Sequence, residues 1–183
     1  MTDEELLRLI ARKDPTAFRE WYDRHSQSLY AYALRLLRDP QAAEDVLSEA
    51  MLAVWFEAAR FRGDCQPRTW LYRIARNKAI ELLRRRPADP LPLTDGVCGP
   101  WERDQERVDL RVTLEQALHA LPPDQREVVE LAFFHDLPYQ EIARILDCPV
   151  NTVKTRMFWA KRKLRHALSP SEEAESEGLE DAP

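Results

Sequence analysis

The chain has 183 residues, 44% of them hydrophobic, with 27 Lys and Arg against 32 Asp and Glu and a formal net charge of −5. No apolar run approaches the roughly 20 residues that a membrane-spanning helix needs, and the acidic start MTDEELLRLI lacks the apolar stretch of a signal peptide. These features favour a cytoplasmic protein with no membrane insertion of its own.

Apolar residues recur at spacings of three and four along most of the chain, without strand-like alternation, which predicts an all-α fold. The first helix is expected at about 3–12 and the second at about 15–38, where Asp39-Pro40 ends it. One side of the second helix forms a predicted core stripe, made of Phe18, Tyr22, His25, Leu29, Ala33 and Leu36.

The third helix, at about 41–61, has two opposed faces. One is an ordinary apolar stripe that includes Met51 and Val54. The other mixes polar and large apolar side chains: Asp45, Ser48, Glu49, Leu52 and Phe56. Spacing alone leaves two interpretations open, a solvated face or a surface that docks on another protein through apolar anchors rimmed by charge.

A short loop, 61–67, precedes the fourth helix, expected at about 68–86. Apolar residues mark the buried side of this helix, and Arg73, Arg76, Asn77 and Arg84 lie roughly opposite. Residues 85–107 then lose the helical period and become rich in Pro, Gly and Asp. We expect a first helical domain over 1–86 and a flexible linker over 87–107.

The second domain is expected over 108–168, as four helices at 108–121, 124–136, 137–147 and 150–168 that include a helix-turn-helix. The tail, 169–183, carries six carboxylates and no cation, and we expect it to be disordered.

Positive charge is concentrated in DCPVNTVKTRMFWAKRKLR, residues 147–165. This stretch contains six Lys and Arg and no carboxylate after Asp147. Such a helix fits the major groove of DNA, where its first turns meet base edges and its cations meet phosphates. A solvated basic helix is the alternative, and the absence of acidic residues disfavours it.

In both halves the chain resembles the extracytoplasmic-function (ECF) sigma factors, the small sigma-70 proteins that keep only regions 2 and 4. TWLYRIARN, PPDQREV and PVNTVKTR, in this order, carry the resemblance, which covers about 15–88 and 108–168. It implies a protein that binds core RNA polymerase and directs it to promoters.

For the −35 element, the resemblance implies duplex binding by the last helix. Lys154, Thr155 and Trp159 match the main base-contacting positions. Asn151, Thr152, Arg156 and Arg162 lie beside them. Trp159 departs from the family, where Arg is common, and replaces a cationic contact with an apolar or stacking one.

For the −10 element, the resemblance implies that one base of the non-template strand flips into a pocket of the loop that starts at Phe61. Asn77 matches a base-reading position, and nearby arginines can hold phosphate. The expected single-strand site comprises Phe61, Arg62, Gly63, Asp64, Cys65, Gln66, Arg68, Trp70, Arg73, Arg76 and Asn77.

The mixed face of the third helix matches the surface by which region 2 docks on a coiled coil of core RNA polymerase. Ser48 stands where Gln is usual, so one polar contact is expected to be lost. The expected partners are core RNA polymerase, promoter DNA and an anti-sigma factor.

Two other functional classes fit the sequence less well. A free-standing helix-turn-helix regulator would need a ligand pocket or a dimer interface in the first domain, and no pattern indicates either. An enzyme is disfavoured because the four histidines are scattered and no catalytic motif occurs. The three cysteines, Cys65, Cys98 and Cys148, form no C-x-x-C pair, so no metal site, disulfide framework or cofactor is expected.

Overall fold

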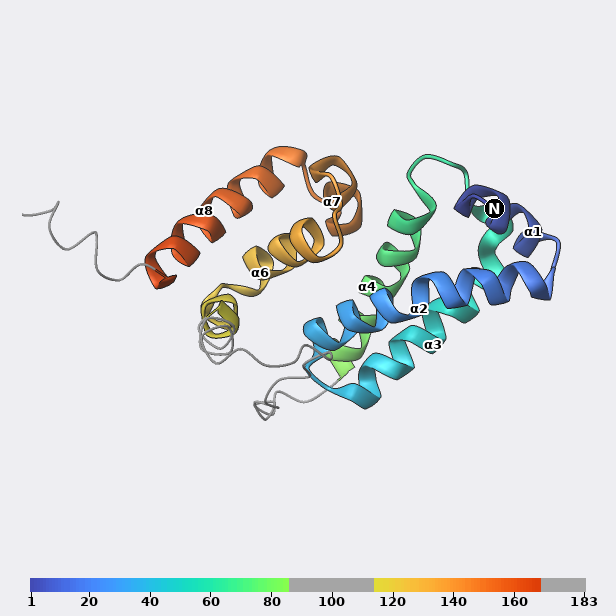
Figure 1. Ribbon diagram of the computed structural model, residues 1–183, viewed down its shortest axis with the longest axis horizontal. Coiled ribbons are helices and arrows are strands. Elements are labelled where there is room, and N and C mark those ends of the chain that lie inside the picture. The colour runs from blue at the N-terminus through green and yellow to red at the C-terminus, as the bar shows by residue number, and fades with distance from the viewer. Residues whose placement is uncertain (86–113, 169–183) are drawn as a thin grey trace, which may run out of the picture. The chain divides into compact units, whose positions relative to one another are not determined.

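The computed structural model describes residues 1–85 and 114–168, and every regular element within them is helical (Figure 1). The all-α prediction is therefore confirmed. The chain divides into two compact units, of which one contains α1–α4, the short helix η1 and α7, and the other contains α6, η2 and α8. The predicted linker, 87–107, and the predicted tail, 169–183, lie outside the described residues. No helix in the described ranges is both long and apolar enough to cross a bilayer.

Side-chain caps set the starts of the first three helices. Thr2 and Glu5 form a capping box at α1 (Asp3–Ala11), and the Thr2 N–H holds the pKa of the Glu5 carboxyl below its usual value. Asp14 accepts two backbone N–H groups at the start of α2 (Pro15–Leu37). Asp39 caps α3 (Pro40–Glu57) in the same way, so the Asp39-Pro40 pair that ends one helix also begins the next.

The core of the first unit is built around large aromatic side chains. Trp21, Tyr32 and Tyr72 are almost fully buried, and the rings of Tyr32 and Tyr72 lie 5.2 Å apart, joining α2 to α4 (Pro67–Arg85). The predicted stripe of α2 is wrong at Tyr22, which is 41% exposed. The neighbouring Trp21 fills the core in its place, whereas His25, Leu29 and Ala33 are buried as predicted.

The apolar stripe of α3 is buried as predicted, through Met51 and Val54. The last turn of the expected helix, however, tightens into η1 (Ala58–Arg60), which starts with the buried Ala58. The chain therefore leaves the helix earlier than its period suggests. The same unit contains α7 (Tyr139–Leu146), which packs on α4, and the Gln66 N–H donates to Glu141 Oε2 at 3.4 Å.

In the second unit, α6 (Pro123–Val129) packs along α8 (Val150–Leu168). The guanidinium of Arg126 donates to the carbonyls of Leu118, His119 and Leu121, and so satisfies the end of a helical stretch over 114–120. The helix expected at 124–136 is α-helical only to Val129, because Glu130–Phe134 forms a π-helical turn, η2. The turn leaves Phe133 and Phe134 exposed.

A buried histidine ties α1 to α2. His25 packs against Trp21 with ring centroids 4.3 Å apart, and its Nε2 lies 3.1 Å from Asp3 Oδ2. Burial lowers the pKa of His25, and the nearby Asp3 carboxylate opposes this only in part. The folded protein therefore disfavours the charged imidazole.

Stability is expected to fall as the pH drops from 7 to 5. The unfolded chain binds a proton at His25 more readily than the folded chain, so protonation below the ordinary pKa of about 6.5 favours unfolding. Urea denaturation at the two pH values should show a smaller fall for His25→Gln than for the wild type. His166→Gln changes an exposed histidine and should keep the wild-type dependence. An equal fall in all three proteins would contradict the assignment to His25.

Candidate nucleic-acid interface

The helix α8 separates an apolar face from a polar one. Asp147, in a left-handed conformation with φ of 52°, ends α7, and α8 begins at Val150 after Cys148 and Pro149. Val153, Met157 and Ala160 are buried. The other sides of α8 carry the predicted −35 residues, most of which are exposed to solvent.

The predicted residues of α8 do not all have the same environment. Five of them are exposed: Asn151, Lys154, Thr155, Trp159 and Arg162. Thr152 and Arg156 are half-buried, and Arg156 Nε forms an ion pair with Asp124 Oδ2 of α6 at 3.1 Å. Arg156 is thus already engaged by a carboxylate, whereas Lys154 has no ion pair within the described residues.

An aromatic pair dominates the exposed face of α8. Phe158 is 62% exposed and Trp159 is 43% exposed, and their rings meet edge to face with centroids 5.4 Å apart. The guanidinium of Arg162 lies 5.5 Å from the centre of the Trp159 ring. Sequence reasoning missed Phe158, although its position three residues after Thr155 and four after Lys154 places it between them on the helix surface.

The loop before α4 presents a second group of candidate residues. Gly63 has φ of 76°, a conformation that suits glycine, and the rings of Phe61 and Trp70 lie 5.6 Å apart across the loop. The exposed members of the predicted single-strand site are Arg62, Gly63, Asp64, Gln66, Arg73 and Asn77. The half-buried members are Phe61, Cys65, Arg68, Trp70 and Arg76.

Two half-buried members of this group have structural contacts of their own. The guanidinium of Arg68 lies 5.5 Å from the centre of the Tyr72 ring. Burial raises the pKa of the Cys65 thiol, and the Glu141 carboxylate raises it further. Cys65 is therefore a neutral thiol at pH 7 and adds no charge to the site.

The mixed face of α3 is exposed at all five predicted positions, Asp45, Ser48, Glu49, Leu52 and Phe56. Leu52 is 55% exposed and Phe56 is 69% exposed. Lys13 Nζ lies 5.3 Å from the centre of the Phe56 ring, and Lys78 Nζ is 3.1 Å from Glu49 Oε2. The structure thus presents two apolar side chains within a charged surround.

Comparisons with known proteins agree across both halves of the chain. Residues 21–87 match the Sigma-70 region 2 family, and residues 111–164 match the Sigma-70, region 4 family. The chain is 32% identical to the RNA polymerase sigma-H factor of Pseudomonas aeruginosa and 33% identical to the ECF RNA polymerase sigma factor SigK of Mycobacterium bovis. Each match covers 92% of this chain and 94% of the relative.

One solved structure has a similar fold over most of the chain. The structure of CnrH in complex with the cytosolic domain of CnrY matches with a TM-score of 0.69 and 25% identity, over 92% of this chain and 98% of that one.

Removing a cation from α8 and removing an aromatic ring from it should change the salt dependence of DNA binding differently. Lys154→Ala should weaken binding to a cognate duplex about tenfold at low salt and make the slope of log affinity against log salt shallower by about one, because one phosphate contact is lost. Phe158→Ala should weaken binding without changing the slope, because an apolar side chain releases no counterion. Gel-shift titrations at several KCl concentrations measure both quantities.

The control for charge is Arg19→Ala, which removes an exposed cation from α2 and should leave the slope unchanged. An equally shallow slope in Lys154→Ala and Phe158→Ala would contradict the assignment of a phosphate contact to Lys154 and an apolar contact to Phe158.

Proposed function

The chain belongs to the ECF group of the sigma-70 family of RNA polymerase sigma factors, and we propose which of its surfaces binds each partner of such a factor. A sigma factor binds core RNA polymerase and directs it to promoters, where transcription starts. The observation that carries the proposal is that residues 21–87 match region 2 and residues 111–164 match region 4 within one chain.

The −35 element is the proposed duplex ligand of α8. Lys154, Thr155 and Arg162 project from the exposed side of the helix and can meet base edges and phosphates in the major groove. Phe158 and Trp159 add apolar surface suited to thymine methyl groups. Asn151, Thr152 and Arg156 flank this surface, and Arg156 must exchange its Asp124 partner before it can bind a phosphate.

The −10 element is the proposed single-stranded ligand of the loop and of α4. Phe61 and Trp70 offer aromatic faces on which bases can stack, and Asn77 offers both a donor and an acceptor for a base edge. Arg62 and Arg73 are exposed near them and can bind the strand's phosphates. Stacking and phosphate contacts together offset the few kcal/mol that unstacking a base costs.

The mixed face of α3 is the proposed docking surface for core RNA polymerase. Leu52 and Phe56 are the apolar anchors, and Asp45, Ser48 and Glu49 form the polar rim. Along the sequence, the proposed division is 1–86, a linker over 87–107, and 108–168, although α7 of the last segment groups with the first compact unit in the structure. A cytoplasmic location and the absence of catalysis by the factor itself are part of the same proposal. A second protein partner, an anti-sigma factor, is proposed because the sigma factor RpoE of Bartonella quintana, a structural neighbour with a TM-score of 0.65 and 22% identity, was solved in complex with the anti-sigma factor NepR.

Leu52→Glu and Phe56→Glu should each weaken co-elution with core RNA polymerase in gel filtration by at least tenfold in apparent affinity. Each change removes an apolar anchor and puts a charge in its place. The matched control is Leu168→Glu, which changes an exposed leucine at the end of α8. Retention of both α3 variants by the polymerase would rule out this docking surface.

Promoter-dependent transcription tests the function itself. Core RNA polymerase with this protein should start transcripts at a defined set of sites on fragmented genomic DNA, and core polymerase alone should not. A free-standing regulator would bind DNA without co-eluting with polymerase, and the matches to both regions do not favour that reading. Absence of any site-specific transcript from the wild-type protein would overturn the proposal.

A further inference from the structure

The turn between α1 and α2 carries a lysine in an unfavourable backbone conformation. Lys13 has φ of 67°, in the left-handed region that favours glycine. The Lys13 N–H donates to the Ile10 carbonyl at 2.8 Å. The next N–H, that of Asp14, donates to the Leu9 carbonyl at 3.2 Å, which completes a helix end that usually has glycine at the position of Lys13. The backbone therefore disfavours a lysine here, and contacts of its side chain have to compensate.

The side chain of Lys13 reaches the C-terminal end of α3. Its Nζ donates a hydrogen bond to the backbone carbonyl of Trp55. Trp55 lies in the last turn of α3, where carbonyls lack partners within the helix and the helix dipole favours a positive charge. Because α1 also packs on α3 and on η1, Lys13 caps α3 from a neighbouring helix.

The ammonium group of Lys13 also lies near two aromatic rings. Its Nζ is 5.2 Å from the centre of the Trp55 ring and 5.3 Å from the centre of the Phe56 ring, within the roughly 6 Å reach of cation–π attraction. The Trp55 ring is half-buried and meets Phe18 edge to face, with centroids 5.2 Å apart. Phe56, in contrast, is 69% exposed. Lys13 therefore joins a ring that faces solvent to one that is fixed by packing.

We propose that Lys13 positions Phe56 for docking on core RNA polymerase. Phe56 is one of the two apolar anchors of the proposed docking surface, so the inference rests on the proposed function. Lys13 restrains the ring before the polymerase binds, and this removes part of the entropy cost of ordering an exposed side chain on association. The docking surface thereby extends from α3 to the turn between α1 and α2, none of whose residues is expected there from sequence.

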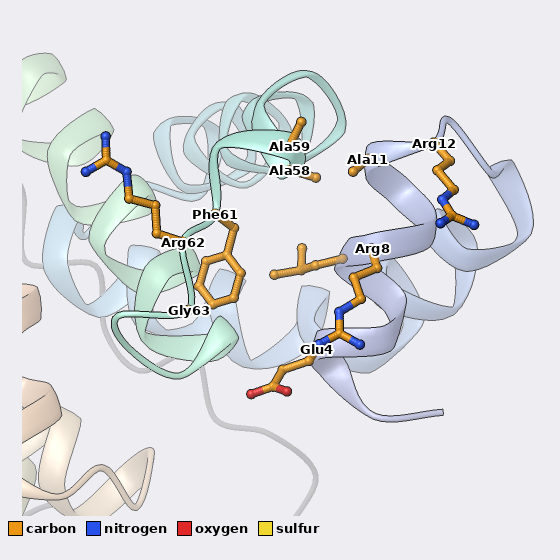
Figure 2. A pocket seen from close by; sticks show the side chains of 10 residues that line it. Glu4, Arg8, Ala11, Arg12, Ala58, Ala59, Phe61, Arg62 and Gly63 are labelled. Carbon is orange, nitrogen blue, oxygen red and sulfur yellow. The ribbon is translucent and has the colours of Figure 1, made fainter.

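A neighbouring cation in the same turn provides the matched control. Arg12 lines a pocket of about 470 Å³ between α1 and the segment that joins α3 to α4, and Arg8 and Phe61 line it as well. Figure 2 shows the side chain of Arg12 turned away from Phe61. Neither Lys13 nor Phe56 lines this pocket. Arg12→Ala therefore removes an exposed cation next to Lys13 and leaves the contact between Lys13 and Phe56 in place.

The test measures competition for core RNA polymerase by fluorescence anisotropy. A fluorescein-labelled wild-type chain is bound to the polymerase and displaced by unlabelled full-length variants. Lys13→Gly removes the whole side chain, and Lys13→Met keeps an apolar stem without the charge. Each should compete about three- to tenfold less well than the unlabelled wild type, because the ring of Phe56 is no longer held. Arg12→Ala should compete as the wild type does.

Thermal unfolding separates positioning from a role in folding. Lys13→Gly loses the hydrogen bond to the Trp55 carbonyl but relieves the left-handed backbone. Its midpoint, followed by far-ultraviolet circular dichroism, should therefore stay within about 3 °C of the wild type. A larger fall would overturn the inference, because Lys13 would then act mainly on the fold.

A double-mutant cycle shows whether Lys13 acts through Phe56. In the Phe56→Ala background, Lys13→Gly should cause no further loss of competition, because the side chain that Lys13 positions is already gone. An equal loss in both backgrounds would indicate a separate contact between Lys13 and the polymerase, and the positioning role would be wrong.

Failure of this inference and failure of the proposed function give different results. If the wild type binds core polymerase and Phe56→Ala weakens it, but Lys13→Gly and Lys13→Met compete like Arg12→Ala, the role of Lys13 is overturned and the function stands. If the wild type does not bind core polymerase, both fail.

Discussion

Burial of three large aromatic side chains is the constraint on which the first unit depends. Trp21 and Tyr32 of α2 and Tyr72 of α4 are almost completely removed from solvent, and each such side chain buries roughly 150–250 Å². At about 25 cal/mol per Å², the three together contribute on the order of 10 kcal/mol before entropic costs. Because the buried Tyr72 anchors α4 to the core, the side chains on the outer side of α4 and in the loop before it are not needed for packing. They can therefore serve in binding.

Ion pairs with carboxylates within the protein limit which Lys and Arg side chains are available to bind DNA. Arg24, Lys78, Arg144 and Arg156 each lie within ion-pair distance of a carboxylate. Each such pair must be exchanged before its cation can meet a phosphate, and at exposed sites the exchange costs about 1 kcal/mol or less. An overall net charge of −5 is thus compatible with two locally positive surfaces, since ionic screening limits each field to about 8–10 Å at physiological salt.

Each of the two proposed DNA sites contains a pair of aromatic side chains. Phe61 with Trp70, and Phe158 with Trp159, are pairs in which rings support one another while part of their surface stays exposed. Neighbouring exposed rings form an apolar patch, and such patches often mark a binding surface. Bases and thymine methyl groups are suitable partners, and the arginines beside the rings supply the phosphate contacts that make such binding dependent on salt.

The sequence by itself determined the helical class, the family and the approximate positions of most of the described helices. The reason is that the apolar period, the Asp-Pro caps and the order of the sigma motifs are local properties of the chain. Only the tertiary structure decided which face of each helix was covered. It buried Trp21 of α2 where Tyr22 was expected, and it ended the α-helix of 124–136 early at η2. It also paired Arg156 with Asp124 and left Phe158 exposed. It also placed residues of α1, among them Arg8, around the same pocket as Phe61, about fifty residues away in the chain. Such outcomes depend on contacts between residues distant in sequence, and no local period encodes them.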